Sequence, residues 1–200
     1  MQEIELLKHI FEKFPGVGPK QAERFVYFLL HSGDNFRQEL SKVINTLNNN
    51  LQKCELCASH FTHNGDVKFC RICSDPKRDS SKLLIVEKET DINKIEKSGA
   101  YNGLYFSTNM LISPLKDSKS HARFLNLIKN KIKKQNGIQE LIVAFSATFD
   151  GDYSAKYIKE NLNMENIKIS FLARGISTGT EIEYADPETL AQAISNRKNA

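Results

Sequence analysis

The sequence predicts a multidomain α/β protein whose parts differ in composition. Residues 4–29 carry apolar side chains at helical spacing, two pairs of cysteines follow, and from residue 82 short apolar runs alternate with helical stretches. Apolar strands that alternate with helices are typical of a parallel sheet with helices on its faces. With 200 residues, the chain can form one large domain or two small ones with a hydrophobic core.

The composition is that of an ordinary globular protein, with 40% hydrophobic and 26% charged residues. No apolar run approaches the ~20 residues that cross a bilayer, and the first ten residues lack the pattern of a signal peptide. We therefore expect a cytoplasmic protein without a membrane partner. A net charge of +4 favours an anionic partner only weakly, since lysines in runs such as residues 129–136 are usually solvated.

Residues 14–24, FPGVGPKQAER, predict a tight turn between two helices. Apolar residues recur every three or four positions on both sides of this segment, as expected for helices. Gly16 and Gly18 can take backbone angles that are closed to other residues. Pro19 suits the first position of the second helix, where its missing N–H costs nothing.

The start of this second helix is a candidate phosphate-binding site. Its first amides have no partner within the helix, and Gly16 and Gly18 lack the side chains that would keep a phosphate away. Lys20 and Arg24 are four residues apart and share one helical face. The pattern predicts contact with a nucleic-acid backbone, and a simple turn is the alternative.

The four cysteines form two Cys-x-x-Cys pairs with twelve residues between them: Cys54, Cys57, Cys70 and Cys73. Each pair turns two sulfurs toward one point, and two pairs complete a tetrahedron around Zn²⁺. Because all four ligand positions are filled, we predict one structural zinc ion per chain. Two disulfides are the alternative, which a cytosolic chain disfavours. His60 and His63, between the pairs, are expected to be surface residues.

Residues 82–87 and 140–145 are expected to be buried strands, residues 167–172 form a third strand, and residues 104–106 are a candidate for a brief one. Helices are expected between them, at residues 91–99, 120–137 and 153–162. Gly99 and Gly137 are expected to end the first two helices, because glycine favours the position after a helix.

Three carboxylates are expected near the carboxyl ends of these strands, where ligands bind in open α/β sheets. Glu87 ends the first strand, and Asp150 and Asp152 follow the strand at 140–145. Together they could hold Mg²⁺ through oxygen ligands, or the two aspartates could simply turn the chain and cap the next helix. Asp186 is placed to cap a C-terminal helix that begins after it.

Several of these segments resemble known motifs. Residues 14–24 resemble the helix-hairpin-helix motif of DNA-binding proteins. A glutamate at the end of the first strand, with Asp-x-Asp after a later one, looks like the Toprim domain of topoisomerases and primases. The order of hairpin, four-cysteine module and Toprim-like domain resembles the RecR family of bacterial recombination mediators over nearly the whole chain. Further markers are CELC…CRICSDPKRD, LLIVEKETDINKIEKSGAYNGLYF, ISPL, ATFDGD and LARGISTGTEIEYADPETLAQAI.

The resemblance divides the chain into four parts. It implies a helix-hairpin-helix DNA-binding region at residues 1–53 and a C4 zinc finger at 54–73. A Toprim domain is expected at 81–175, and a C-terminal segment similar to a Walker B motif at 176–200.

The resemblance also implies a function without catalytic residues. The family is known as a non-enzymatic DNA-binding mediator that forms a ring-like tetramer around DNA. It acts with RecO and RecF to help load the RecA recombinase at gapped or single-stranded DNA, which implies a cytoplasmic, nucleoid-associated protein. Basic hairpin residues matching Lys20 and Arg24 would contact DNA. The region of Glu87 would contact RecO, and Asp186 would lie at a subunit interface.

This chain departs from the family in two places. The family commonly has Glu-Gly-Glu where residues 150–152 are Asp-Gly-Asp, and Lys116 and Lys119 replace a glycine-rich continuation after Ser-Pro-Leu. The shorter acids keep Mg²⁺ binding open, although no requirement for it is expected. A Mg²⁺-dependent Toprim nuclease or other phosphoryl-transfer enzyme is therefore the alternative function, and a zinc-stapled interaction protein without DNA affinity is a third. The absence of a Gly-x-x-x-x-Gly-Lys-Ser/Thr loop argues against nucleotide hydrolysis.

Overall fold

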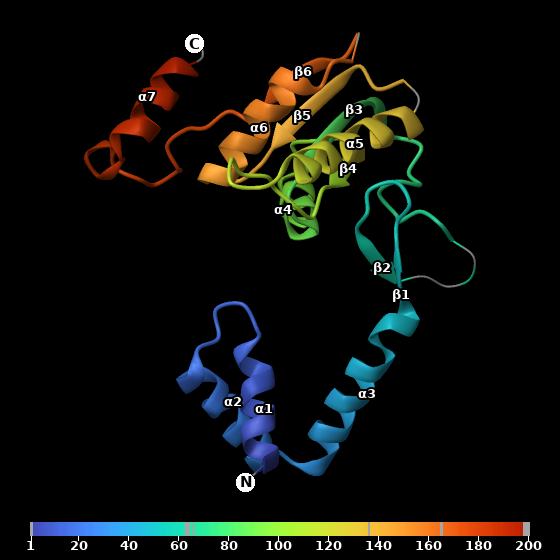
Figure 1. The fold of residues 1–200 in the computed structure, drawn as a ribbon, viewed down its shortest axis with the longest axis vertical. Coiled ribbons are helices and arrows are strands. Elements are labelled where there is room, and N and C mark those ends of the chain that lie inside the picture. The colour runs from blue at the N-terminus through green and yellow to red at the C-terminus, as the bar shows by residue number, and fades with distance from the viewer. Residues whose placement is uncertain (1, 63–64, 66, 136, 165, 198–200) are drawn as a thin grey trace. The chain divides into compact units, whose positions relative to one another are not determined.

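The computed structural model describes residues 2–62, 65, 67–135, 137–164 and 166–197 (Figure 1). It divides the chain into two compact units, Met1–Leu51 and Gln52–Ala200, called the first and second unit below. The first unit is helical, and the second contains a parallel sheet with helices. This arrangement confirms the predicted mixed α/β fold class.

The first unit consists of three helices among the residues described: α1 (Gln2–Glu12), α2 (Pro19–His31) and α3 (Asp34–Asn50). The predicted tight turn lies between α1 and α2, and Pro19 is the first residue of α2 as expected. Gly16 has φ +76°, a left-handed conformation that favours glycine. Gly18, in contrast, has φ −89° and ψ 174°, which any residue adopts, so the expectation of a special backbone angle there was wrong.

The second unit is built on four parallel strands: β3 (Asp79–Val86), β4 (Gly103–Ser107), β5 (Glu140–Ala144) and β6 (Lys168–Phe171). Their order in the sheet is β4-β3-β5-β6, with β4 and β6 at the edges. A separate two-stranded sheet pairs β1 (Leu51–Lys53) with β2 (His60–Thr62). Because all strands of the larger sheet are parallel, their carboxyl ends share one edge, as the sequence predicted.

The helices of the second unit are α4 (Glu89–Ser98), α5 (Ser118–Lys134), α6 (Phe149–Asn161) and α7 (Pro187–Ser195), with a short 3₁₀ helix at Ile182–Tyr184 before α7. Gly99 ends α4 in the left-handed conformation, as predicted. Gly137 does not end α5: the helix stops three residues earlier, and the buried Gln135 that follows it has left the helical conformation.

Helix α6 begins at Phe149, four residues before the predicted start. Thr148 is the N-cap, and its hydroxyl accepts a hydrogen bond from the Gly151 amide at 3.2 Å. Asp150 and Asp152 therefore lie in the first turn of α6, where negative charge complements the helix dipole. The aspartates follow the strand as expected, but a threonine rather than an aspartate caps the helix.

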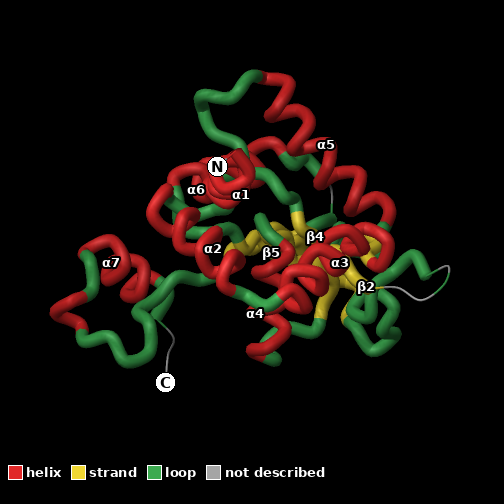
Figure 2. The backbone as a smooth tube through the Cα atoms, turned by 90° about the horizontal axis from the view of Figure 1, so that it is seen from below, coloured by secondary structure: helices red, strands yellow, loops and turns green. Residues whose placement is uncertain are grey.

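Side chains alternate along the central strands, so the sheet has an apolar core on each face. Leu83 and Ile85 belong to one core, which includes residues of α5 and α6 such as Phe124 and Ile158. Leu84 and Val86 belong to the other, which includes Ile92 of α4 and three of the cysteines. In Figure 2 the strands lie between α5 on one side and α4 on the other. None of the helices within the described ranges is long and apolar enough to cross a membrane.

Candidate metal centre and nucleic-acid contacts

Two short turns bring the four cysteines together beside the small β1–β2 sheet. In the first turn, the amide of Ala58 donates to the Cys54 carbonyl at 3.0 Å, and the Cys54 amide donates to the Ser59 carbonyl at 2.9 Å. In the second, the Ser74 amide donates to the Cys70 carbonyl at 3.0 Å. Each Cys-x-x-Cys pair thus has the compact turn that the spacing predicted.

The geometry of the cluster fits a tetrahedral metal. The four sulfur atoms lie within 4.8 Å of one another, and the Sγ atoms of Cys57 and Cys70 are 3.5 Å apart. Four sulfurs around Zn²⁺ at bond lengths of ~2.3 Å are about 3.8 Å apart, whereas a disulfide requires about 2.05 Å. All four cysteines are free thiols, and only Cys73 is not fully buried. The disulfide alternative is therefore not formed, and the donor set fits a closed structural zinc site.

The interactions among the four thiols also favour a bound cation. A hydrogen bond from the Cys57 thiol lowers the pKa of Cys54, whereas the interaction with Cys54 raises the pKa of Cys73. Without a cation the neighbouring sulfurs therefore cannot all ionise together. A divalent metal removes this conflict, because it is bound by thiolates.

The cysteine module is docked on the sheet through its backbone. The Ser107 amide at the end of edge strand β4 donates to the Cys57 carbonyl at 2.9 Å. Glu89, at the start of α4, accepts from the His60 amide at 2.6 Å and lies 2.9 Å from His60 Nδ1. Partial burial by itself raises the pKa of Glu89, but the contacts with His60 outweigh it and lower that pKa. His60 is exposed, as expected, yet has this structural partner; His63 lies outside the described residues.

A second network joins the segment after the cysteines to the sheet. The guanidinium of Arg78 binds both carboxylate oxygens of Glu96, at 2.7 and 2.5 Å, and the Tyr105 hydroxyl donates to the same carboxylate at 2.6 Å. Arg78 and Glu96 are mostly buried, with side-chain exposures of 12% and 21%. The module therefore shares both its core and its polar contacts with the sheet, and belongs to the same compact unit.

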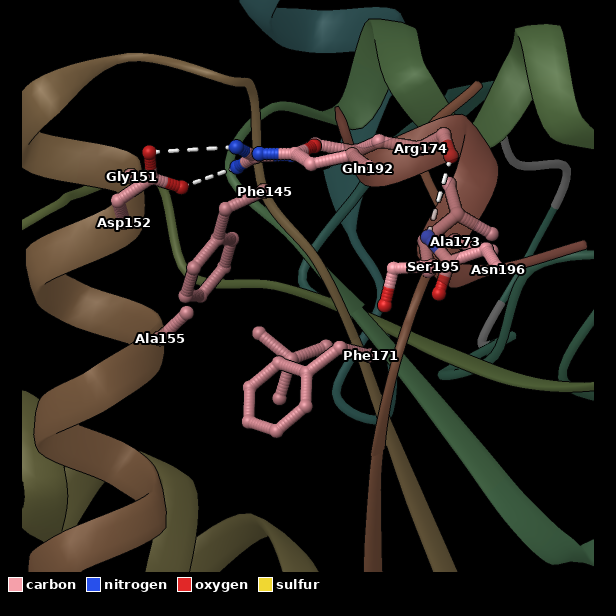
Figure 3. A pocket seen from close by; sticks show the side chains of 12 residues that line it. Phe145, Gly151, Asp152, Ala155, Phe171, Ala173, Arg174, Gln192, Ser195 and Asn196 are labelled. Atoms are coloured by element: carbon pink, nitrogen blue, oxygen red, sulfur yellow. Dashed lines mark hydrogen bonds and ion pairs between the residues drawn. The ribbon is translucent and has the colours of Figure 1, made fainter. Parts of the chain in front are cut away.

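The three predicted carboxylates are not assembled into a metal site. Glu87 follows β3 and lies 3.7 Å from the ammonium of Lys88, while Asp150 and Asp152 lie on α6. Within the described part of the chain, only the cysteines form a group of three or more potential ligands. Asp152 instead forms an ion pair with Arg174 (Figure 3). The arrangement does not fit a preformed Mg²⁺ site, and Mg²⁺ binding there stays a prediction.

Arg174 borders a cavity of about 410 Å³ at the carboxyl edge of the sheet (Figure 3). Residues of β5, α6, the segment after β6 and α7 line it. The side chain of Asn196, just after α7, donates to the Arg174 carbonyl at 3.2 Å and thereby ties α7 to this edge. Asp186 caps α7 as predicted, accepting a hydrogen bond from the Thr189 amide at 2.9 Å, and its pKa is lowered by Thr189. Its role at an interface stays a prediction.

The start of α2 in the first unit is open. Gly18 is its N-cap and supplies no side-chain cap, and the amides of Lys20 and Gln21 have no acceptor among the residues described. A Cβ atom placed on Gly16 or Gly18 would meet nothing within 4 Å. Lys20 and Arg24 are exposed and form no ion pair with any described residue. The structure thus offers free donors and free cations at the predicted positions.

Several residues that contact the cysteine module or line the cavity were not predicted from the sequence. Arg174 lies three residues after the end of the last strand, so its position near the carboxyl edge of the sheet was a usable signal. Three other contacts join residues that are far apart in the sequence, so no local pattern reveals them. Glu89 binds His60 across 29 residues, Glu96 binds Arg78 across 18, and Lys131 binds Glu55 across 76.

Comparisons with known proteins identify the family. Residues 81–173 match a family model described as Toprim domain, and residues 175–198 match one described as RecR, C-terminal. A protein named Recombination protein RecR from Brachyspira hyodysenteriae is 36% identical over 200 residues, covering 98% of this chain and 96% of the relative. Proteins of the same name from Ureaplasma urealyticum and Phytoplasma mali are 36% and 37% identical, again covering 98% of this chain, and 96% and 94% of the relatives. These names are those of recombination proteins rather than enzymes, in agreement with the expected non-enzymatic class. The chain therefore belongs to the RecR family of recombination proteins.

Proposed function

We propose that the protein is a non-enzymatic DNA-binding mediator of recombination and repair, which binds the sugar–phosphate backbone at the start of α2. The observation that carries the proposal is the open helix terminus: two unpaired amides, a glycine N-cap and two exposed cations without partners. Membership of the RecR family supports the recombination role.

The geometry supports contact with phosphates rather than with base edges. A phosphate approaching Gly18 meets the amides of Lys20 and Gln21 first, at the positive end of the helix dipole. The side chains of Lys20 and Arg24 then supply positive charge on the adjoining helical face. Contacts of this kind position nucleic acid without reading its sequence, which suits a protein that acts at gaps of any sequence.

The proposal includes the zinc ion, the assembly and the partners. One Zn²⁺ held by the four cysteines keeps the module folded against the sheet. A ring-like tetramer would encircle DNA, with Asp186 near one subunit contact, and would act in the cytoplasm at the nucleoid. RecO would bind near Glu87 and act together with RecF, so that RecA is loaded onto gapped or single-stranded DNA.

The salt dependence of DNA binding tests the phosphate contacts. We would measure the affinity for a fluorescent gapped duplex by anisotropy at several salt concentrations, for the parent, Lys20→Ala, Arg24→Ala and the double variant. Each lost phosphate contact is expected to reduce the slope of log affinity against log salt by about 1. Lys42→Ala removes an exposed lysine of α3 and is the matched control. Equal slopes for all variants would show that α2 does not hold DNA.

A nicking assay tests the non-enzymatic part of the proposal. Supercoiled plasmid incubated with the metal-loaded protein and Mg²⁺ or Mn²⁺ is expected to stay intact, because the three carboxylates are not assembled around a metal position. Nicking that disappears in Asp150→Ala would replace the proposal with the alternative of a metal-dependent nuclease.

A further inference from the structure

Lys131 is the one charged side chain that is fully buried within the described part of the chain, with 5% of its surface exposed. It occupies a core position of α5 beside the buried Ile128 and Ile132, whereas Lys133 and Lys134 on the same helix are exposed. Lysine is almost never fully buried unless it is paired, because an ammonium group loses its hydration in the interior. Among described carboxylates, none lies within the 4.0 Å that defines an ion pair with it. A different negative charge must compensate it.

The contacts of Lys131 are directed toward the cysteine module. Its Nζ donates a hydrogen bond to the carbonyl of Glu55 at 3.1 Å and lies 5.2 Å from the centre of the Phe106 ring. Glu55 stands between Cys54 and Cys57 in the first Cys-x-x-Cys turn. The hydrogen bond joins residues 76 positions apart, so tertiary packing brings this lysine to the turn.

With a metal bound, the cysteines are thiolates and can supply the missing negative charge. Burial lowers the pKa of Lys131, and the nearby sulfurs of Cys73, Cys57 and Cys54 act in the opposite direction. Four thiolates around one Zn²⁺ keep a formal double negative charge after the metal is bound. Because Lys131 binds a carbonyl within the first Cys-x-x-Cys turn, its ammonium group is placed where such a negative charge would favour it.

We propose that Lys131 is the built-in counter-cation of the metal centre, through which the sheet domain strengthens zinc binding by the cysteine module. The inference rests on the proposed zinc site and adds a residue outside the ligand set to it. Lys131 is a positioning residue: it holds the carbonyl of Glu55, and its charge offsets the excess charge of the thiolates. Zinc binding is thereby coupled to the docking of the module against α5 and β4.

Three substitutions separate charge from packing. Lys131→Arg keeps a cation and hydrogen-bond donors, Lys131→Gln keeps a donor without charge, and Lys131→Met keeps only the apolar length. Lys133→Met removes an exposed lysine from the same helix and is the matched control. Zinc content per chain is measured first, followed by the rate and equilibrium of zinc transfer to a chromogenic chelator.

The Gln and Met variants are expected to bind zinc about 10- to 100-fold more weakly than the parent, the range typical of lost outer-shell partners. The Arg variant is expected to stay within a few-fold of the parent, and the Lys133→Met control to be unchanged. Thermal unfolding adds a second readout. Loss of the charge should lower the midpoint temperature of unfolding of the zinc-loaded protein. It should not lower that of the metal-free protein, because the buried ammonium has no counter-charge once a chelator has removed the zinc.

Zinc binding by Lys131→Gln and Lys131→Met equal to that of the parent would overturn the proposal. Equal destabilisation of the zinc-loaded and chelated forms would also overturn it, because the lysine would then only fill space. If Lys131→Met fails to fold, the comparison of the Gln and Arg variants decides the same question. A parent protein that binds no metal would remove the zinc site itself, an outcome distinct from equal binding by all variants.

Discussion

The two units of the chain differ in what their surfaces do. The second unit buries apolar residues on both faces of its sheet, and its charged residues form internal networks. The first unit fully buries only Ala22 and Val26 among its described residues, while Leu6, Phe28 and Ile44 are each more than 60% exposed. Its cations at the start of α2 are unpaired as well. The second unit therefore has an extensive core of its own, whereas many apolar side chains of the first unit are not covered by that unit.

The exposed apolar side chains of the first unit suggest a surface for assembly. Contiguous exposed apolar residues on a small unit are typical of a protein–protein interface. An apolar hollow of about 310 Å³, lined mainly by leucines and isoleucine of α1, α2 and α3, adds to that surface. The same unit carries the proposed phosphate contacts, so assembly and DNA binding would both depend on it. Substitutions in each unit test this contrast between them.

Loss of the metal centre should affect the second unit alone. In Cys57→Ser we expect zinc to be released and the module to lose order, because structural zinc contributes ~10–16 kcal/mol of binding free energy in small modules. Hydrogen exchange should accelerate at the cysteine turns and at the start of α4, where Glu89 holds His60. Exchange in α1 and α2 is the internal control, and faster exchange there would contradict the independence of the two units.

Loss of an exposed apolar side chain should weaken assembly rather than folding. Phe28→Ser removes a ring that is 61% exposed and contacts the ring of Phe36 edge-on. If this surface is an interface, the change should cost at least about 2 kcal/mol of association energy, or about 30-fold in dissociation constant. Light scattering over a dilution series measures it, with Leu127→Ser of α5 as the control. An unchanged molar mass in both variants would contradict an oligomer formed through the first unit.

The Arg78–Glu96–Tyr105 network should stabilise the second unit in a pH-dependent way. Arg78 holds the pKa of Glu96 below its usual value, so this contribution is complete above the unfolded pKa of about 4.3. It is lost as the pH falls through the lower pKa of the folded state. Glu96→Gln is expected to cost about 2 kcal/mol at pH 7, since bonds to charged groups contribute ~1.5–3 kcal/mol.

Urea unfolding of the parent and Glu96→Gln between pH 7 and pH 3 provides the measurement. The difference in unfolding free energy between the two proteins should shrink toward acid pH, because the parent loses its ionised carboxylate. A difference that stays constant over this range would mean that shape rather than charge explains the effect.

Helix α7 differs from the other α-helices of the second unit, because it has no fully buried residue among those described. Its start depends on the side chain of Asp186, which binds both the amide and the hydroxyl of Thr189. Asp186→Ala should cost about 1 kcal/mol of local stability, the usual value for a lost N-cap. Hydrogen exchange in α7 should rise about five-fold while the strands are unaffected. Asp186→Asn, which can still cap, is the control, and equal exchange in both variants would contradict the capping role.

Local sequence was enough to predict the features that depend on neighbours along the chain. Helical and strand periods, the proline that begins α2, the glycine that ends α4 and the Cys-x-x-Cys spacing all predicted what the structure contains. These signals work because backbone angles and short-range hydrogen bonds depend on a few adjacent residues. They also predicted the cap at Asp186, where the side chain and the amide it binds are three residues apart.

Contacts between side chains that are distant in the sequence could not be predicted in this way, because they depend on how the elements pack. Asp152 and Arg174 form an ion pair across 22 residues, because the segment after β6 lies beside α6. Sequence reasoning had placed Asp152 in a carboxylate cluster that could hold Mg²⁺ and had not foreseen this arginine. Lys131 looks like another surface lysine of a basic helix, yet the packing of α5 against the sheet buries it and aims it at the cysteine turn. Such long-range contacts depend on how whole helices and strands pack. Burial and electrostatic interactions between distant residues are properties of the folded chain rather than of any local segment.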